Sequence, residues 1–347
     1  MNKISSDQIM PACPVFGTCG GCQYQHLSYD EQLRLKERQI REQIGGELAL
    51  DEDVFSAMVS SPRQYHYRSR MDIKLLRIRS GEMFMGFSPV EGRRVVEIDS
   101  CPIAMQTISD FIPRLRYEAM ERMPQKYRNA NLTIKTGDDG RVVWGGIGRR
   151  SLRMTPEEYF WTDVAGKRIF FSLETFFQAN LAILPRVIER IRSYGLFDQQ
   201  TVFLDLYGGV GLFGICFHDD AGRVILIEEN VHAVRCAEKN IRHNQCDRMA
   251  IYSGRTEDLF NEVLCDVPLS SAVVMIDPPR AGLSPQAAED LSGRADIPHI
   301  LYLSCHPESL LRDLKVFCRA GWQVENVTPF DFFPQTRHIE TLVHLSR

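Results

Sequence analysis

The spacing of apolar and polar positions changes along the chain and divides it into three regions. Residues 1–60 hold a cysteine cluster and then a helical pattern, which Ser28 can cap with Glu31 three positions later. Residues 61–170 read mostly as short apolar runs between Gly, Asp and Asn turns, which predicts an antiparallel sheet. In residues 171–347 strand patterns alternate with helical patterns, which is typical of a mostly parallel sheet covered on both faces.

The predicted fold class is therefore α/β, with a Rossmann-like domain in the last region and a smaller antiparallel β-rich domain in the middle. In the middle region we expect strands within residues 67–79, 83–90, 95–103, 132–137 and 141–148. In the last region we expect them within residues 201–207, 223–230, 271–279, 299–305, 322–330 and 339–346.

A glycine-rich turn follows the first strand of the last region. The stretch "VFLDLYGGVGLFG" runs from a strand through Gly209 and Gly211 into a helix, and Glu228 ends the next strand. Glycines let a ligand approach the backbone, and an acidic residue about 20 positions downstream can bind ribose hydroxyls. Such a turn also serves ordinary strand-to-helix packing, and it suits NAD equally well. Asp277 in "MIDPPRAG" ends another strand at the same expected edge.

Cys305 stands at the end of the apolar run "HILYLSC", at the edge where Glu228 and Asp277 are expected. That is a position for a nucleophile, whereas the alternative is a small buried cysteine that only packs. Pro307 ends the strand, and a helix beginning near Glu308 would bring its positive N-terminus close to the sulfur and favour thiolate.

Charge is unevenly spread over the 347 residues, of which 44% are hydrophobic and whose net charge is −4. Residues 1–170 carry 25 Lys and Arg against 22 Asp and Glu, which leaves 16 against 23 for the rest. The stretch 62–80 is strongly basic with aromatic residues interleaved, a composition that suits phosphates and unpaired bases. We take Arg68, Arg70 and Lys74 as RNA-binding candidates. The alternative is a solvated edge strand.

Ten cysteines occur in a chain with neither a signal-peptide pattern nor an apolar run long enough to span a membrane. We therefore expect a cytoplasmic protein whose cysteines are thiols, metal ligands or a nucleophile. Cys13, Cys19 and Cys22 share one glycine-rich loop, and Cys101 before Pro102 can supply a fourth ligand. An iron–sulfur cluster and a structural zinc ion both fit four cysteines.

Several motifs in order resemble the RNA uracil-5 methyltransferases that use S-adenosylmethionine, and the resemblance covers nearly the whole chain. The motifs are "CPVFGTCGGCQYQH", "FFQAN", "DLYGGVGLFG", "IDPPRAG", "LSCHP" and "FDFFPQTRHIETL". The resemblance implies a class I methyltransferase domain with Cys305 as the nucleophile and Glu340 as the general base. It implies cofactor contacts at Gln178, Tyr207, Glu228 and Asp277, beside the glycines of the turn, and a [4Fe-4S] cluster on Cys13, Cys19, Cys22 and Cys101.

The chain departs from the family pattern at three positions. Gly208 stands where the family usually has Cys, Leu212 where a polar residue is more usual, and His306 where Asn follows the nucleophile. Glu340 could also be an ordinary ion-pair partner of Arg337.

The predicted function is methyl transfer to C5 of a uridine in RNA. The chain has no room ahead of its cysteines for the small β-barrel of some members, which points to 23S rRNA as the substrate. The T-loop uridine of tRNA is the alternative, and we expect a monomer with no membrane partner. From other classes, a non-catalytic RNA-binding protein and an iron–sulfur redox protein remain as alternatives, against which the pairing of Cys305 with Glu340 and the lack of another redox motif argue.

Overall fold

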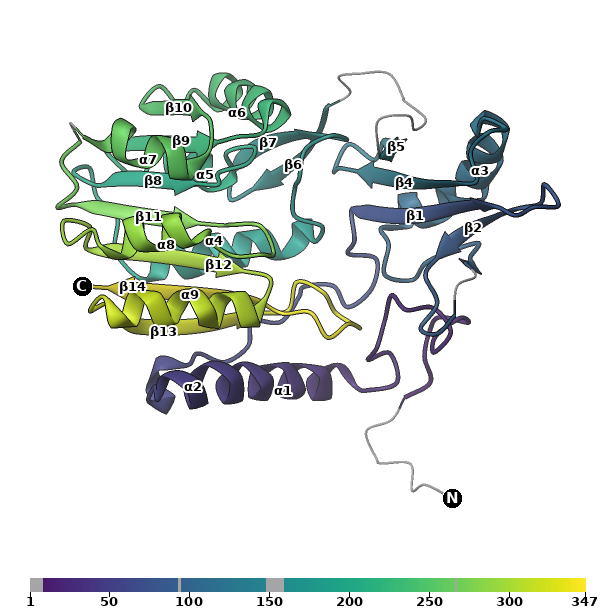
Figure 1. Ribbon diagram of the computed structural model, residues 1–347, viewed down its shortest axis with the longest axis horizontal. Coiled ribbons are helices and arrows are strands. Elements are labelled where there is room, and N and C mark those ends of the chain that lie inside the picture. The colour runs from purple at the N-terminus through teal and green to yellow at the C-terminus, as the bar shows by residue number, and fades with distance from the viewer. Residues whose placement is uncertain (1–8, 93–94, 148–158, 266) are drawn as a thin grey trace.

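A seven-stranded sheet organises the C-terminal half of the protein, whose structure is a computed structural model describing residues 9–92, 95–147, 159–265 and 267–347 (Figure 1). Its strand order is β10-β9-β8-β11-β12-β14-β13. All neighbours are parallel except β14, which runs antiparallel to both β12 and β13. The strands are β8 (Val202–Leu206), β9 (Arg223–Glu228), β10 (Met249–Ser253), β11 (Ala272–Ile276), β12 (His299–Ser304), β13 (Gln323–Phe330) and β14 (Glu340–Ser346).

Helices cover both faces of this sheet, as the continuous apolar runs predict. Successive residues of a strand point to opposite faces, so Phe203 packs in one buried cluster and Leu204 in the other. One face is covered by α4 (Leu184–Ser193), α5 (Leu212–Phe217) and α6 (Val231–Asn244). The other is covered by α7 (Thr256–Leu264), α8 (Pro285–Ser292) and α9 (Pro307–Arg319).

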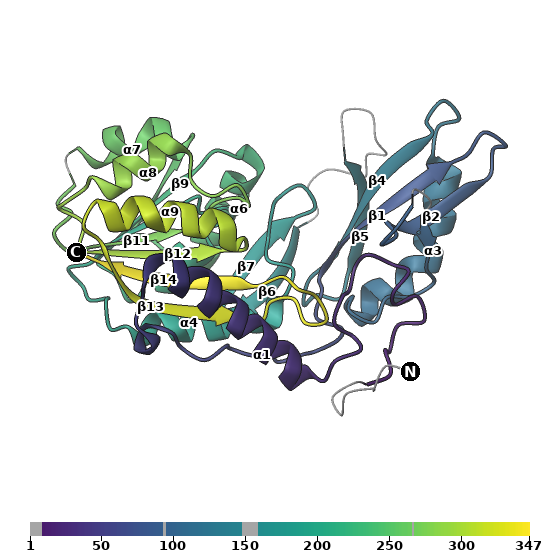
Figure 2. The ribbon, with the colours of Figure 1, turned by 60° about the horizontal axis from the view of Figure 1, so that its bottom comes forward.

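The middle region forms a separate five-stranded antiparallel sheet of order β3-β2-β1-β4-β5, seen beside the larger sheet in Figures 1 and 2. Its strands are β1 (Arg70–Arg77), β2 (Met83–Phe87), β3 (Val96–Glu97), β4 (Asn129–Thr136) and β5 (Val142–Ile147). The antiparallel arrangement confirms the prediction, although β3 is much shorter than the expected run.

One face of the smaller sheet packs on a helix that we did not predict, α3 (Gln106–Arg122). Ile108, Ile112, Leu115 and Ala119 are fully buried on this helix. Their spacing of three and four residues is a helical signal, which the surrounding strand patterns obscured.

The N-terminal segment begins with the cysteine loop and continues into α1 (Tyr29–Ile40), which runs below β13 and α9 (Figures 1 and 2). Ser28 caps this helix as predicted, because its Oγ accepts a hydrogen bond of 3.3 Å from Glu31 N. The chain then passes through a π-helical turn, Arg41–Gly45, a short α2 (Gly46–Leu48) and a 3-10 turn, Glu52–Val54.

A hairpin of β6 (Tyr159–Val164) and β7 (Lys167–Ser172) lies across the expected boundary at residue 170. Its Phe160 and Phe171 belong to the buried cluster of the larger sheet. The division at residues 60 and 170 stays a prediction, with this hairpin on the side of the larger sheet. A 3-10 turn, Leu181–Ile183, then leads into α4. Within the described ranges, the helices are too short or too polar to cross a lipid bilayer.

Candidate active site and cysteine loop

Cys305 and Glu340 are brought together by the pairing of two strands. Ser304, the last residue of β12, is paired with Thr341 of β14. Cys305 is therefore next to Glu340, the first residue of β14, because the two strands run in opposite directions. Asp277 follows β11, the other neighbour of β12. The register thus gathers one thiol and two carboxyl groups at the edge of the larger sheet.

Burial raises the pKa of all three groups, and neighbouring carboxyl groups add to the rise at Glu340 and Cys305. Burial, reinforced by Asp277, holds the pKa of Glu340 well above its ordinary value. Burial likewise raises the pKa of Asp277 to about 7, against a hydrogen bond from Gln178. Burial and the carboxylates of Glu340 and Asp277 raise the pKa of Cys305 to about 12, while Arg280 opposes the rise. Each of the three groups therefore holds its proton more tightly than the same group does in water.

The expectation that a helix N-terminus favours the thiolate of Cys305 meets opposing effects at the sulfur. The helix α9 does begin at Pro307, close to the predicted residue. Burial and two acidic neighbours oppose this effect, because they favour the protonated thiol. The alternative role of Glu340 is not supported: Glu340 is buried, Arg337 is exposed, and these two described residues form no ion pair.

Gln178 joins this group of residues from the segment between β7 and α4. Its Nε2 donates a hydrogen bond of 3.2 Å to Asp277 Oδ2. The segment is held by Asn180, whose Nδ2 donates to Ser61 Oγ and to the backbone oxygen of Phe332, both at 3.0 Å. Gln178 is therefore fixed next to a carboxyl group that carries a raised pKa.

The glycine-rich turn follows β8 with left-handed backbone at Tyr207, Gly209 and Gly211. No heavy atom lies within 4 Å of the place where a Cβ on Gly209 would be, so a ligand can approach the backbone there. Glu228 ends β9 as predicted, and its Oε2 accepts a hydrogen bond of 2.8 Å from Gly209 N. The hydroxyl of Tyr207 donates to Glu257 Oε1 at 3.2 Å.

The departure from the family pattern at Gly208 has a steric reason. A Cβ at this position would lie 2.7 Å from Cγ of Leu226, on β9, and 3.0 Å from the backbone oxygen of Asp205. A side chain there would force Leu226 to move, so Gly208 fits its surroundings.

Asp205 is a buried acidic residue that our sequence interpretation passed over. It lies within β8, fully buried, and its Oδ2 accepts a hydrogen bond of 2.8 Å from Gly214 N. Its Oδ1 is buried with no hydrogen-bond partner. Burial raises the pKa of Asp205 to about 8, and Asp277 and Glu228 add to the rise. The signal was an aspartate inside the apolar run "VFLDLY".

The four cysteines of the predicted cluster line one cavity of about 120 Å³, at the junction of the N-terminal loop and the smaller sheet: Cys13, Cys19, Cys22 and Cys101. Among the described residues, no three His, Cys, Asp or Glu side chains form a group that could hold a metal ion. Burial raises the pKa of Cys22 to about 12, and the thiols of Cys101, Cys19 and Cys13 add to the rise. The four thiols are therefore close enough to influence one another.

The three RNA-binding candidates lie in different surroundings. Strand β1 is paired on both sides, with β2 and β4, so the alternative of a solvated edge strand is wrong. Arg70 and Lys74 occupy alternate positions of β1, opposite the face buried on α3. The guanidinium of Arg70 forms an ion pair of 3.1 Å with Asp72. Arg68 lines the cysteine cavity, lies 5.8 Å from the ring centre of Phe333, and has a buried Nε without a partner.

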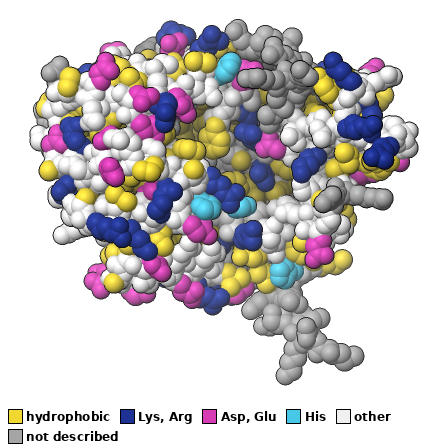
Figure 3. Space-filling model, viewed as in Figure 1, with side chains coloured by type: hydrophobic (Ala, Val, Ile, Leu, Met, Phe, Trp, Pro, Cys, Tyr) yellow, Lys and Arg dark blue, Asp and Glu magenta, His cyan; other side chains and the backbone are white. Residues whose placement is uncertain are grey.

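A hollow separates the larger sheet from the smaller one on the face shown in Figure 3, with Lys and Arg side chains around it. An α/β fold with a glycine-rich turn, a cysteine and carboxyl groups at one sheet edge defines the class of methyltransferases that the motifs suggested.

Comparison with known proteins identifies the family. A model of the family described as tRNA (Uracil-5-)-methyltransferase matches residues 157–347, more than half of the chain. The chain belongs to this family of S-adenosylmethionine-dependent RNA (uracil-5-)-methyltransferases, which confirms the resemblance at the level of the family.

Relatives match along nearly the whole chain. The tRNA (uracil(54)-C(5))-methyltransferase of Schizosaccharomyces pombe is 28% identical over 361 residues, which cover 98% of this chain and 66% of that protein. This chain thus spans just under two thirds of the yeast relative. An uncharacterized RNA methyltransferase of Aquifex aeolicus is 26% identical over 363 residues, covering 96% of this chain and 83% of that one.

The fold is similar to a crystal structure of Pyrococcus abyssi tRNA (uracil-54, C5)-methyltransferase in complex with S-adenosyl-L-homocysteine. The TM-score is 0.71 with 22% sequence identity, and the match covers 94% of this chain and 86% of that one. This similarity confirms the mixed α/β methyltransferase fold.

Proposed function

We propose that the protein transfers a methyl group from S-adenosylmethionine to C5 of a uridine in 23S rRNA, through a covalent adduct between Cys305 and C6 of the base. The observation that carries the proposal is the meeting of Cys305 and Glu340 across the β12–β14 pair, beside the glycine-rich turn. A thiol and a carboxyl group side by side supply the nucleophile and the base that the reaction needs.

The chemistry assigns an order to the two groups. Cys305 gives its proton to solvent and its sulfur bonds to C6, which makes C5 electron-rich. C5 bonds the methyl carbon as the bond between that carbon and the sulfonium sulfur breaks. Glu340 then takes the C5 proton, the C5–C6 double bond re-forms, and Cys305 leaves as a thiolate. Glu340 must lose its own proton to solvent before this step, and its raised pKa then makes its carboxylate a stronger base than an exposed one.

The residues around the turn fit S-adenosylmethionine, which supplies the methyl group when bound. We assign its binding to Gln178, Tyr207, Glu228 and Asp277 together with the backbone of Gly209 and Gly211. Glu228 offers a carboxylate to ribose hydroxyls, and the open space at Gly209 admits a ligand to the backbone. Glu228 now accepts from Gly209 and Asn230, so part of this bonding is exchanged when the ligand enters.

We infer that Cys13, Cys19, Cys22 and Cys101 hold a [4Fe-4S] cluster. A cavity of about 120 Å³ is several times the roughly 10–15 Å³ that one water requires, so it suits a group much larger than one zinc ion. A four-iron cluster binds each thiolate at a different iron atom, so its ligand sulfurs lie farther apart than those around a single ion. Binding to iron would deprotonate the four thiols despite the raised pKa of Cys22.

A second candidate substrate is tRNA, because the yeast relative is named for uridine 54 of tRNA. The test supplies purified protein with labelled S-adenosylmethionine and either 23S rRNA or tRNA transcripts, followed by nucleoside analysis. We expect 5-methyluridine in the 23S transcript. Label in tRNA alone would move the substrate to the second candidate, and label in neither RNA would contradict the proposed function.

We infer that the protein acts on RNA as a monomer, without a membrane partner. Chromatography of the protein with measured mass tests the expectation.

A further inference from the structure

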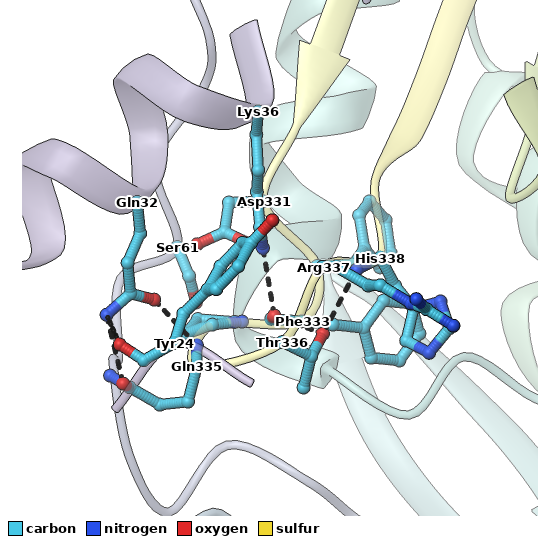
Figure 4. A network of polar contacts seen from close by, with 12 residues as sticks. Tyr24, Gln32, Lys36, Ser61, Asp331, Phe333, Gln335, Thr336, Arg337 and His338 are labelled. Atoms are coloured by element: carbon cyan, nitrogen blue, oxygen red, sulfur yellow. Dashed lines mark hydrogen bonds and ion pairs between the residues drawn. The ribbon is translucent and has the colours of Figure 1, made fainter. Parts of the chain in front are cut away.

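The loop that leads into Glu340 is buried although it has no regular secondary structure. It spans residues 331–339, between β13 and β14, and only Arg337 and His338 in it are exposed. A buried loop must find partners for its backbone polar groups. The partners of this loop come largely from the N-terminal segment, as Figure 4 shows.

A buried ion pair fixes the start of the loop. Lys36 Nζ, on α1, lies 2.6 Å from Asp331 Oδ1, and both side chains have no exposed surface. The same ammonium donates a hydrogen bond of 3.0 Å to the backbone oxygen of Phe333. A buried ion pair is a weak source of stability compared with apolar packing, because both charges must be desolvated. The ion pair instead fixes the geometry of the loop, since the ammonium of Lys36 contacts both Asp331 and the backbone oxygen of Phe333.

A reciprocal pair of amides fixes the middle of the loop. Gln32, one helical turn before Lys36, accepts from Gln335 N at 2.9 Å and donates to Gln335 Oε1 at 3.0 Å. Gln335 has φ of 70°, in the left-handed region that a side chain rarely adopts. The backbone N–H groups of Gln23 and Tyr24 donate to Gln335 O at 3.0 and 2.9 Å. These contacts hold Gln335 in its strained conformation.

The N-terminal residues that contact this loop are also hydrogen-bonded to the cysteine loop. Gln23 Nε2 donates to Gly20 O at 2.8 Å, and Gln25 Oε1 accepts from Cys13 N at 3.0 Å. On the other side, Tyr67 OH donates to Pro334 O at 3.0 Å. The loop before Glu340 is thus held between the cysteine loop, α1 and the entry to the smaller sheet.

We propose that residues 23–36 are a positioning element for Glu340, with Lys36 and Gln32 as its two positioning residues. The inference rests on the proposed function, because it gives Glu340 the base role. Holding residues 331–335 fixes where the chain enters β14, and therefore where the carboxylate of Glu340 meets C5. A displacement of about 1 Å at a reacting group can cost about 100-fold in rate.

The test separates positioning from stability with a paired substitution. Lys36→Met alone leaves Asp331 buried and unpaired, which destabilises the fold. Lys36→Met with Asp331→Asn removes both charges, so the unfolding temperature should recover most of that loss. Without the bond to Phe333 O, we still expect turnover to fall by about 10-fold to 100-fold, with the protein–RNA adduct accumulating on a denaturing gel.

A second variant leaves the ion pair intact. Gln335→Gly removes the side chain held by Gln32 while allowing the same left-handed backbone, and it should also accumulate adduct. Arg38→Ala is the matched control on α1, because its side chain is 64% exposed and forms only a long contact with Glu42. S-adenosylmethionine binding should be unchanged in every variant.

The outcomes distinguish the inference from the proposed function. If the double variant recovered turnover along with stability, or lost turnover without adduct, Lys36 would have a structural role only and the inference would fail. If wild type made no 5-methyluridine and Glu340→Gln trapped no adduct, the proposed function would fail, and the inference with it.

Discussion

Two regions of the molecule present cysteines to a ligand, and they do so in opposite ways. Cys305 is a single thiol whose place is set by paired strands, with two carboxyl groups beside it. The four cysteines of the other region line a cavity between an irregular loop and the smaller sheet, with one another and Arg68 as neighbours.

The difference separates a reactive sulfur from a ligating one. Hydrogen bonds of the sheet hold Ser304, the residue before Cys305, whether or not a ligand is present, so the place of the sulfur does not depend on a ligand. The four cluster cysteines lie outside regular strands, and a metal group that binds all four would join the N-terminal loop to the smaller sheet. Both regions raise the pKa of their thiols, to about 12 for Cys305 and for Cys22. At Cys22 a bound metal would offset the raised pKa, because coordination deprotonates a thiol.

The largest effect is expected from removing the thiol of Cys305. We expect Cys305→Ala to lower turnover by about 10⁴-fold or more, because no other described side chain at this sheet edge is a thiol. S-adenosylmethionine binding should persist. RNA containing 5-fluorouridine should trap wild type but not the variant, since fluorine cannot leave C5 as a proton does.

The control for this prediction is Cys318→Ala, which removes another half-buried thiol near the C-terminal end of α9, the helix that begins shortly after Cys305. It should turn over normally. Methylation by Cys305→Ala at a rate near that of wild type would disprove the nucleophile.

The acidic edge should also control how stability depends on pH. Asp205 and Asp277 have folded-state pKa values raised to about 8 and about 7, so the folded state binds more protons than the unfolded state between about pH 4 and these values. Stability therefore falls as pH rises through this range. Asp205→Asn should remove about 3 kcal/mol of the loss between about pH 5 and 8, measured by urea unfolding without ligand.

An exposed aspartate provides the comparison. Asp53→Asn should leave the pH profile unchanged, because Asp53 lies on the surface. If Asp205→Asn and wild type gave parallel profiles, the carboxyl group of Asp205 would be ionised in the folded protein throughout this range.

The cysteine loop is tested through its ligand. Anaerobically purified wild type should be brown, and Cys19→Ser should be colourless with a loosened N-terminal segment, visible as faster proteolysis before α1. We expect turnover to fall about 10-fold, as when support for a metal site is lost. The control is Cys265→Ser, which replaces an exposed cysteine outside the cluster, and this variant should keep the brown colour. Colourless wild type with one zinc ion per chain would contradict the iron–sulfur assignment.

The smallest effects should come from the basic residues of the smaller sheet. Lys74→Ala should weaken RNA binding by roughly threefold and flatten its salt dependence, as a lost phosphate contact does. Arg70→Ala should do less, because Asp72 already neutralises part of its charge. Arg114→Ala is the control, as it lies on α3 across the sheet. Equal RNA affinity and salt slope in all of these proteins would move the RNA surface away from β1.

The sequence predicted the sheet edge better than it predicted the loops. Residues at strand ends follow from apolar runs whose lengths are visible in the sequence, which is why Glu228, Asp277 and Cys305 were expected at one edge. The raised pKa of Cys305 was not predictable in the same way, because its largest cause is burial, which depends on how segments far apart in the sequence pack around the sulfur.

The contacts between α1 and the loop before Glu340 could not be predicted from the sequence. Helix α1 buries Gln32 and Lys36 together with Ile40, although Lys and Gln are usually exposed. A pattern of apolar and polar positions assigns such residues to the solvent face. Only the partners Asp331 and Gln335, some 300 positions away, explain why they lie inside.

That separation has a consequence for how the protein acquires its activity during folding. Lys36 and Asp331 are 295 positions apart, so their contact closes a loop of most of the chain, which is entropically costly and slow. Strands such as β8 and β9 pair with near neighbours in sequence and can form earlier. Strand pairs of the larger sheet would then form before the first helix docks, and the arrival of that helix would complete the packing of the loop that leads into Glu340.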